Sequence, residues 1–397
     1  MAVRLNYSGS IAPEYGDCPM PIQPSLAARL DAVVDRAIAE KRLVGAVVLV
    51  ARNGAPAYRR AAGFANREEA LPMREDTVFR LASVTKPIVA AAAMRLLEEG
   101  AIALDDPVTR FLPDFRPRLA SGEAPALTVH RLLTHTAGLG YSFFEPPDGP
   151  YHRLGVSDGL DQPGLPIEEN LRRLAAAPLL YAPGTAWGYS LAMDVLGALL
   201  AKASGEPLPR LVERLVLAPL GLRRSGFAVP DDVRLATPYY DGRPEPARMS
   251  DPCDVPFREA RVRFAPGRAL DPASYPSGGA GMIGVADDVL RFLEAIRGGG
   301  APILSRATVE RMTADQVGPQ AQTRGPGWGF GYGWAVLADP AAAATPQSAG
   351  TYQWGGGYGH SWFVDPVEAL TVVALTNTAF EGMTGAFVTQ LRDAVYG

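Results

Sequence analysis

The sequence predicts an α+β fold with one antiparallel sheet that is built from both ends of the chain. Strand patterns gather near the two termini, whereas helical patterns fill the part between them. We therefore expect strands from both ends to meet in one sheet, with helices on its faces and a mostly helical region inserted in the middle. One unit is expected over residues 1–104 and 282–397, and a second, mostly helical unit over 105–281. The boundary between two such units is a natural place for a cleft.

The N-terminal part predicts a helix, a pair of strands and a short third strand. Residues 25–43 carry apolar side chains at helical spacing. Residues 44–54 are an apolar, β-branched run that ends in Asn-Gly, and residues 55–65 follow it, which predicts two strands joined by a tight turn. A short strand is expected over 76–82.

A buried helix is expected next, from residue 83 to residue 99. This segment is rich in alanine and leucine, and it stops at Gly100. Pro87 falls in its first turn, where a missing N–H group costs little stability.

The middle of the chain is expected to be helical and to end in a long loop region. Helical patterns occur at residues 128–138, 167–177, 191–205 and 208–221. Residues 228–280 are rich in proline, arginine and aspartate, which predicts an extended loop region.

The C-terminal part returns to strands after two more helices. The two helical patterns lie at residues 286–299 and 305–316. Strand patterns follow at residues 331–338, 350–356, 359–366 and 369–378. A last helix is expected at 385–396. These strands are expected to complete the sheet that begins near the N-terminus.

Composition and charge argue against several classes of function. The 397 residues carry 38 basic and 42 acidic side chains with no basic run, which argues against a surface for nucleic acid. No uninterrupted apolar stretch of about 18 residues occurs, so no membrane span is expected. Residues 1–16 lack the apolar core of a signal peptide, and Cys18 and Cys253 are too few for a disulfide framework. We expect a cytoplasmic protein, and the sequence leaves its oligomeric state open.

Ser83 and Lys86 form an S-x-x-K pattern at the start of the predicted alanine-rich helix. Residues three apart share a helix face, which brings the lysine amine within reach of the hydroxyl. A serine hydroxyl is a weak nucleophile until a base takes its proton, and a desolvated lysine can be that base. Only three of the 38 basic residues are lysines, and arginine cannot act as the base because it stays protonated. On the motif alone, a serine cap and a surface lysine remain the alternative.

Two other segments are candidates for the same site. Tyr189 stands between a loop containing Pro, Gly and Trp and an apolar helix, where a tyrosine can donate or accept a proton or simply pack. Gly355, Gly356 and Gly357 follow Trp354 within a strand pattern. Such glycines suit close approach of the backbone to a ligand, with an N–H directed at an oxyanion. A simple hairpin turn is the alternative for the glycines.

Three further patterns are not expected to carry chemistry. Residues 155–159 read G-x-S-x-G around Ser157, but no strand precedes this serine and a Pro-Gly pair follows, so no nucleophile elbow is expected. The four histidines and two cysteines lack the spacing of a zinc site, and no phosphate-binding loop pattern occurs. We therefore expect no metal and no cofactor.

Five segments resemble the serine β-lactamase superfamily in order and spacing. They are LASVTK at 81–86, LLTHTAGL at 132–139, APGTAWGYS at 182–190, LAPLG at 217–221 and WGGGYGHSWFVDP at 354–366. The resemblance extends from about residue 25 to residue 395. It is close to class C β-lactamases and DD-peptidases, and closest to the family VIII carboxylesterases, which keep the same serine hydrolase core but cleave esters.

The resemblance implies roles for particular residues. Ser83 matches the acylated nucleophile, and Lys86 matches its partner in the S-x-x-K motif. Tyr189 matches the tyrosine that shares proton transfer with this lysine. The backbone N–H groups of Ser83 and Gly357 match the oxyanion hole.

Two departures from the lactamase pattern favour esters over β-lactams. Trp354, Gly355 and Gly356 stand at the K-T-G motif, so a cation suited to a β-lactam carboxylate is replaced by an apolar wall. Leu191 stands where lactamases have the asparagine of Y-x-N, so the amide that would hold an acylamide substrate is absent. The resemblance thus implies a serine carboxylesterase for a small, uncharged and short-acyl ester.

Other activities use the same acyl-enzyme and stay open at the level of sequence. They are an acyltransferase, an amidase or peptidase acting on D-amino acids, and a weak β-lactamase. Outside enzymes, the alternative is a penicillin-binding sensor, although sensors usually need a membrane segment. Further cleft walls are expected at Tyr141, His152, Phe330 and His360, where plain packing is the alternative.

Overall fold

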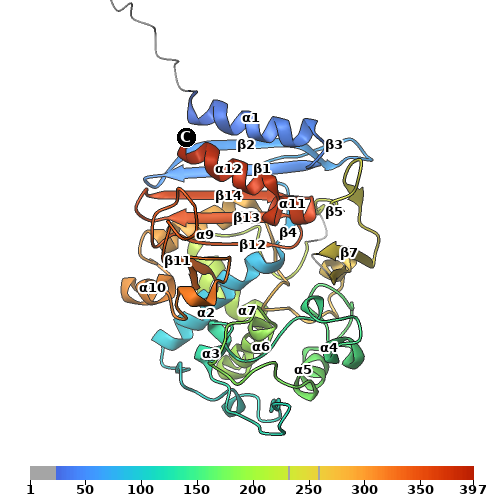
Figure 1. The fold of residues 1–397 in the computed structure, drawn as a ribbon, viewed down its shortest axis with the longest axis vertical. Coiled ribbons are helices and arrows are strands. Elements are labelled where there is room, and N and C mark those ends of the chain that lie inside the picture. Colours follow the sequence, from blue (N-terminus) through green and yellow to red (C-terminus); the bar gives the residue numbers. More distant parts are fainter. Residues whose placement is uncertain (1–23, 231–232, 258–259) are drawn as a thin grey trace, which may run out of the picture.

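The computed structural model describes residues 24–230, 233–257 and 260–397, and its centre is an eight-stranded sheet (Figure 1). In order across the sheet, the strands are β10 (Trp328–Phe330), β11 (Ala335–Leu337), β12 (Tyr352–Gly356), β13 (His360–Asp365), β14 (Leu370–Thr376), β1 (Gly45–Arg52), β2 (Ala55–Asn66) and β3 (Leu71–Pro72). All neighbours are antiparallel. Because β1 from the N-terminal part pairs with β14 from the C-terminal part, both ends build one sheet and the predicted α+β class is confirmed.

Side chains on both faces of the sheet are buried. In β1, Val47 and Leu49 belong to one apolar core, whereas Val48 and Val50 belong to another. A strand that is buried on both faces reads as a continuous apolar run, which is the pattern of residues 44–54.

Helices supply the apolar surfaces that cover the two faces. On one side lie α1 (Leu26–Ala39) and α12 (Ala386–Tyr396), and the core of the other side includes α2 (Thr85–Glu98) and α9 (Ala286–Arg297). In Figure 1, α1 and α12 are seen near the top of the view, and they contact each other. The alanine-rich α2 contacts α6 and α7 of the helical region as well, and most of its residues are buried.

The helices of the inserted region lie in the lower half of Figure 1, but more of its described residues lie in loops than in helices, so the region is less helical than predicted. Its helices are α3 (Val129–Leu133), α4 (Pro150–Leu154), α5 (Ile167–Ala176), α6 (Ala192–Ser204), α7 (Leu208–Val212) and α8 (Ala218–Leu220). α3 is shorter than the predicted helix at 128–138, because His135 adopts a φ of 54°, which a right-handed helix does not allow. A π-helical turn at Glu213–Leu217 separates α7 from α8.

The predicted extended loop at 228–280 contains two hairpins instead. β5 (Tyr239–Tyr240) pairs with β6 (Ala247–Arg248), and β7 (Cys253–Phe257) pairs with β8 (Ala260–Phe264). Side chains in the second hairpin alternate: the buried set includes Val255, Val262 and Phe264, and the exposed set includes Asp254, Arg261 and Arg263. This period of two is visible in the sequence, but proline and arginine obscure it.

The remaining elements are short or lie near the C-terminus. They include β4 (Phe79–Arg80), which pairs with β9 (Ile283–Gly284), the predicted α10 (Arg306–Thr313), and the unpredicted α11 (Ala379–Thr384). Single 3-10 turns occur at η2 (Val108–Arg110), η5 (Pro266–Leu270) and η6 (Pro319–Ala321). Within the three described ranges, no helix combines the length and apolar character needed to cross a bilayer.

Candidate active site

Ser83 and Lys86 lie together at the entry to α2. Ser83 belongs to η1 (Ala82–Val84), a 3-10 turn that leads into the helix, and it lines a cavity of about 660 Å³. Lys86 is completely buried, with its Nζ 3.0 Å from the Ser83 Oγ and 2.7 Å from the carbonyl oxygen of Gly279. The amine therefore has the hydroxyl and a carbonyl oxygen as its hydrogen-bond partners.

The backbone before Ser83 is held in an unusual conformation. Ala82 has a φ of 45°, which residues with a Cβ atom rarely adopt. Its surroundings fix the turn, because the Leu81 N–H donates to the Met282 carbonyl and the His360 Nε2 lies 2.8 Å from the Arg80 carbonyl oxygen. Local strain of this kind persists only where neighbouring structure enforces it, and here it occurs in the residue directly before Ser83.

Tyr189 reaches the same hydroxyl from the loop before α6. Its Oη donates to the Ser83 Oγ at 2.6 Å, and the Lys86 Nζ lies 4.7 Å from the centre of its ring. Trp354 donates from Nε1 to the Tyr189 Oη at 3.4 Å. Two groups able to exchange protons thus converge on Ser83 from segments far apart in the chain.

The glycine run brings β12 against the turn that carries Ser83. A Cβ atom on Gly356 would lie 2.4 Å from the Leu81 carbonyl oxygen, and one on Gly355 would lie 2.4 Å from the His360 carbonyl oxygen. Larger residues would push the strand away. Gly357 follows directly and lines the same cavity as Ser83. Among the described residues, no acceptor pairs with the Gly357 N–H, which leaves that donor free for a ligand.

Aromatic and apolar side chains form most of the cavity wall. They are Phe143, Phe144, Leu160, Trp187, Phe257, Val262, Phe264, Trp354, Phe380 and Met383. Of these, only Trp354 was expected from the sequence. The others come from η3 (Ser142–Phe144), the β7–β8 hairpin, α11 and two loops. An apolar cavity with a few convergent polar groups is typical of a small-molecule site.

The structure places the other expected wall residues outside this cavity. Tyr141 is buried behind Tyr189, with ring centres 5.1 Å apart. Phe330 is buried behind Trp354, with ring centres 5.4 Å apart in an edge-on arrangement. His360 is buried against the turn before Ser83, where burial lowers its pKa to about 4. Three of the expected wall residues therefore support the site from the layer behind it.

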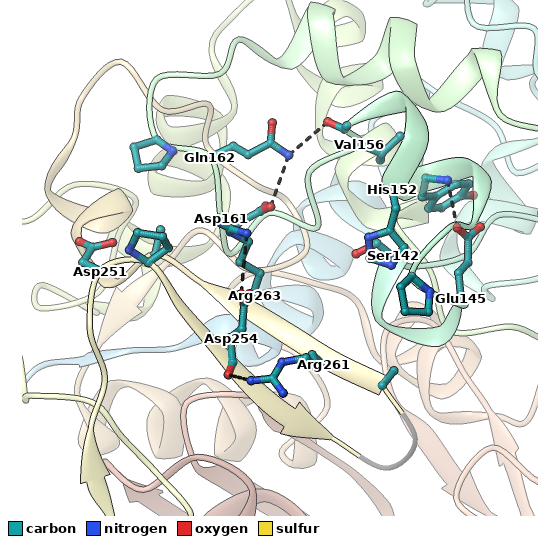
Figure 2. A pocket seen from close by; sticks show the side chains of 17 residues that line it. Ser142, Glu145, His152, Val156, Asp161, Gln162, Asp251, Asp254, Arg261 and Arg263 are labelled. Carbon is teal, nitrogen blue, oxygen red and sulfur yellow. Dashed lines mark hydrogen bonds and ion pairs between the residues drawn. The ribbon is translucent and has the colours of Figure 1, made fainter.

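His152 belongs to a second, larger cavity of about 1090 Å³ (Figure 2). Figure 2 shows Glu145 and His152 on one side of this cavity and Arg261 and Arg263 of the hairpin on the other. Its described lining includes none of the groups around Ser83. Because side chains alternate along β8, the hairpin forms a common wall, with apolar residues facing the first cavity and arginines facing the second.

His135 is a structural partner of Tyr189 to which the sequence analysis gave no role. Its Nδ1 lies 3.1 Å from the Ser190 Oγ, and its carbonyl oxygen accepts from the Gly188 N–H at 3.0 Å. The two contacts flank Tyr189, and the His135 ring lies 5.1 Å from the tyrosine ring. Burial and the nearby Lys86 charge hold the pKa of His135 well below its usual value. The motif LLTHTAGL is the sequence signal that marks this residue.

Asp194 is a second buried group that sequence reasoning missed. It lies in the first turn of α6 and is almost completely buried next to Gly279, whose carbonyl oxygen accepts from Lys86. Burial raises the pKa of Asp194, while the Lys86 charge opposes this rise. The carboxyl group therefore adds a titratable neighbour whose pKa is influenced by the Lys86 charge.

Comparison with protein families gives one match over nearly the whole chain. The model of the Beta-lactamase family matches residues 30–396. Among curated proteins, Esterase EstB of Burkholderia gladioli is 60% identical over 375 residues, which cover 94% of this chain and 95% of that protein.

Solved structures also resemble this chain over most of its length. EstCE1, described as a hydrolase with promiscuous acyltransferase activity, superposes with a TM-score of 0.92 at 52% identity, covering 94% of this chain and 98% of that one. A penicillin-binding protein homologue from Caulobacter crescentus superposes with a TM-score of 0.70 at 24% identity, covering 94% and 97%. The second likeness bears on the fold alone.

Proposed function

Because the chain belongs to the Beta-lactamase family, we propose that its Ser83 cavity is the active site of a serine carboxylesterase that hydrolyses small, uncharged esters. The observation that carries this proposal is the pair of hydrogen bonds on the Ser83 Oγ, one with Lys86 and one with Tyr189. The 60% identity to Esterase EstB over most of both chains supports ester hydrolysis.

The reaction proceeds in two steps through an acyl-enzyme. The Ser83 oxygen attacks the ester carbonyl carbon while Lys86 and Tyr189 take up its proton. The N–H groups of Ser83 and Gly357 stabilise the oxyanion that forms, since the first turn of a helix leaves its N–H groups without intrahelical partners. The leaving alkoxide receives the proton, and water then attacks the acyl group with the same pair acting as base.

The cavity wall supports small esters with uncharged groups near the reacting carbonyl. Trp354 stands where β-lactamases carry a lysine, and its indole offers apolar area beside the Tyr189 hydroxyl. Leu191, at the position of the lactamase asparagine, is completely buried and does not contribute to the described wall.

We also propose that residues 1–104 and 282–397 form the unit that supplies Ser83 and Gly357, and that the unit at 105–281 supplies Tyr189.

A cytoplasmic location completes the proposal. Within the described ranges the buried Cys253 has no disulfide partner, and free thiols are usual in reducing compartments. Cys18 lies outside the described residues.

Acyl transfer to an alcohol is the second candidate activity. EstCE1, at 52% identity, is described as a hydrolase with promiscuous acyltransferase activity. The same acyl-enzyme serves both reactions, and the partition depends on whether water or an alcohol reaches the acyl group first.

The decisive experiment combines turnover with intact mass. Wild-type protein and the Ser83→Ala variant are mixed with p-nitrophenyl esters of increasing chain length, and samples are quenched in acid for mass spectrometry. We expect nitrophenol release that is fastest for short chains, and an acyl adduct that is absent from the variant. Adding a primary alcohol measures transfer against hydrolysis. Equal release by both proteins, or none by the wild type, would overturn the proposal.

A further inference from the structure

Arg324 is the only charged residue in the described lining of the Ser83 cavity. It lies in the loop that leads to β10, and its side chain is exposed. Its guanidinium carbon lies 5.8 Å from the centre of the Trp354 ring, which is within the range of a cation–π contact. Since an arginine side chain stays protonated in proteins, the cavity holds a permanent positive charge beside Trp354.

This charge has no counter-ion among the described residues. No salt bridge or side-chain hydrogen bond within the described ranges includes Arg324, and the described cavity lining holds neither aspartate nor glutamate. Many other arginines of the chain are paired, as Arg297 is with Glu294 and Arg392 with Asp393. The five N–H donors of Arg324 are therefore free to bind an anionic group that enters the cavity.

Trp354 connects the Arg324 side chain to the residues around Ser83. The indole contacts Arg324 and also donates to Tyr189, which contacts Ser83. A guanidinium held against a ring is restricted in its orientation, so it loses less freedom when it binds a planar carboxylate through two hydrogen bonds. The loss of the lactamase lysine at position 354 is thus accompanied by a cation from another loop, which contacts the indole that replaces the lysine.

We propose that Arg324 is a specificity residue that binds a free carboxylate on the substrate, so that this esterase, besides uncharged esters, accepts half-esters of dicarboxylic acids or esters of hydroxy acids and hydrolyses them more readily than their neutral amide analogues. The ester group occupies the apolar part of the cavity next to Ser83, and the carboxylate lies at Arg324. This inference rests on the proposed esterase function and adds to it the charge at the far end of the substrate. Uncharged esters react without the contact.

The test uses pairs of esters that differ only in charge. In the first pair, p-nitrophenyl hydrogen glutarate is compared with the matching glutaramide ester, which carries an amide in place of the carboxylate. In the second pair, 4-acetoxybenzoate is compared with 4-acetoxybenzamide. The first pair places the charge on the acyl group and the second on the alcohol. The measured quantity is the ratio of kcat/KM for the acid over kcat/KM for the amide.

We expect the wild-type ratio to favour the acid in at least one pair and to decline as ionic strength rises. Arg324→Gln should lower that ratio by about tenfold, which corresponds to about 1.4 kcal/mol, mostly through KM. Arg263→Gln serves as the matched control. It removes the same charge from β8, where the arginine lines the second cavity and not the Ser83 cavity. Arg324→Lys should retain part of the preference.

Two results would overturn the inference while leaving the esterase proposal intact. The first is an unchanged ratio in both pairs for Arg324→Gln, which would show that the guanidinium only packs on Trp354. The second is an equal fall for Arg263→Gln, which would show a general effect of net charge. Wild-type protein that hydrolyses none of the four esters would contradict the proposed function itself. Thermal unfolding of each variant confirms that the compared proteins are folded.

Discussion

Two serines of this chain lie in short motifs that hydrolases use, and their surroundings differ. The Ser83 hydroxyl contacts an amine and a phenol and faces a cavity. Ser157, within G-x-S-x-G, is completely buried, and its Oγ donates to the Asp161 carboxylate at 2.6 Å. Both hydroxyls have a group that can accept a proton. Only the first has space for a substrate beside it, so the environment decides which serine can act as a nucleophile.

The loop around Ser157 has the contacts of a structural element. The Ser157 N–H donates to the Asn170 Oδ1 at 2.8 Å, and the Asn170 amide donates back to the Ser157 carbonyl at 3.0 Å. The Gly159 N–H donates to the Ser157 Oγ at 3.2 Å. These bonds satisfy the polar groups of a buried turn, which would otherwise destabilise the fold.

Exchanging each serine for alanine gives the largest expected contrast. Ser83→Ala should lower ester turnover by at least about 10³-fold, because it removes the covalent nucleophile. Ser157→Ala should keep turnover near that of the wild type, but lower the melting temperature, because Asp161 loses a buried hydrogen-bond donor. Ester hydrolysis and thermal unfolding of both variants measure the two effects. An inactive Ser157→Ala variant beside an active Ser83→Ala variant would reverse the comparison.

The second prediction concerns the Lys86 amine. Ser83 has this amine beside its hydroxyl, whereas Ser157 has the Asp161 carboxylate. Lys86→Arg should lower turnover by about 10²-fold or more, nearly as far as Lys86→Ala, because a guanidinium cannot accept the Ser83 proton. Its larger head group also has to fit a site that is completely buried. The exposed Lys202 offers a matched control, since Lys202→Arg makes the same exchange away from the site. High activity of Lys86→Arg would refute proton transfer by this residue.

Local sequence was sufficient to relate Ser83 to Lys86. The alanine-rich run predicts α2, and the three-residue spacing on one helix face agrees with the 3.0 Å between Oγ and Nζ. The same reasoning does not reach Tyr189, which is 106 residues away and was connected to Ser83 by family resemblance. The motif LLTHTAGL marks its supporting residue His135, but nothing in the spacing of His135 predicts the contact with Ser190.

The cavity wall could not be derived from sequence patterns, because distant segments converge on it. Phe144 comes from η3, Phe264 from β8 and Phe380 from α11, and neither β8 nor α11 was predicted. Conversely, Phe330 and His360 lie on strands whose two faces are both buried. Alternation along such a strand does not reveal which side chains face a ligand, so these two were placed in the wall when they lie behind it.

The smallest expected effect concerns Asp158, which follows Ser157 in the buried loop. It accepts hydrogen bonds from the Ser142 N–H and hydroxyl, and burial, aided by the Asp161 charge, raises its pKa to about 8. An unfolded aspartate titrates near about pH 4, so between about pH 4 and pH 8 the folded chain keeps a proton that the unfolded chain has released. The free energy of unfolding therefore falls as pH rises through this window, with a limit of about 1.4 kcal/mol per pH unit for one proton.

Asp158→Asn removes this proton while keeping an acceptor for the Ser142 N–H. Relative to wild type, the variant should become steadily more stable from pH 5 to pH 8. Over this range unfolding of the wild type releases the Asp158 proton, which a higher pH favours, whereas unfolding of the variant releases no proton at this position. Urea unfolding at several pH values measures the difference, and the same exchange at the exposed Asp105 accounts for the loss of net charge. Parallel pH profiles for wild type and Asp158→Asn would contradict the raised pKa. A loss of turnover as large as that of Lys86→Arg would instead give the G-x-S-x-G loop a part in catalysis, because a purely structural loop should affect stability far more than the chemical step.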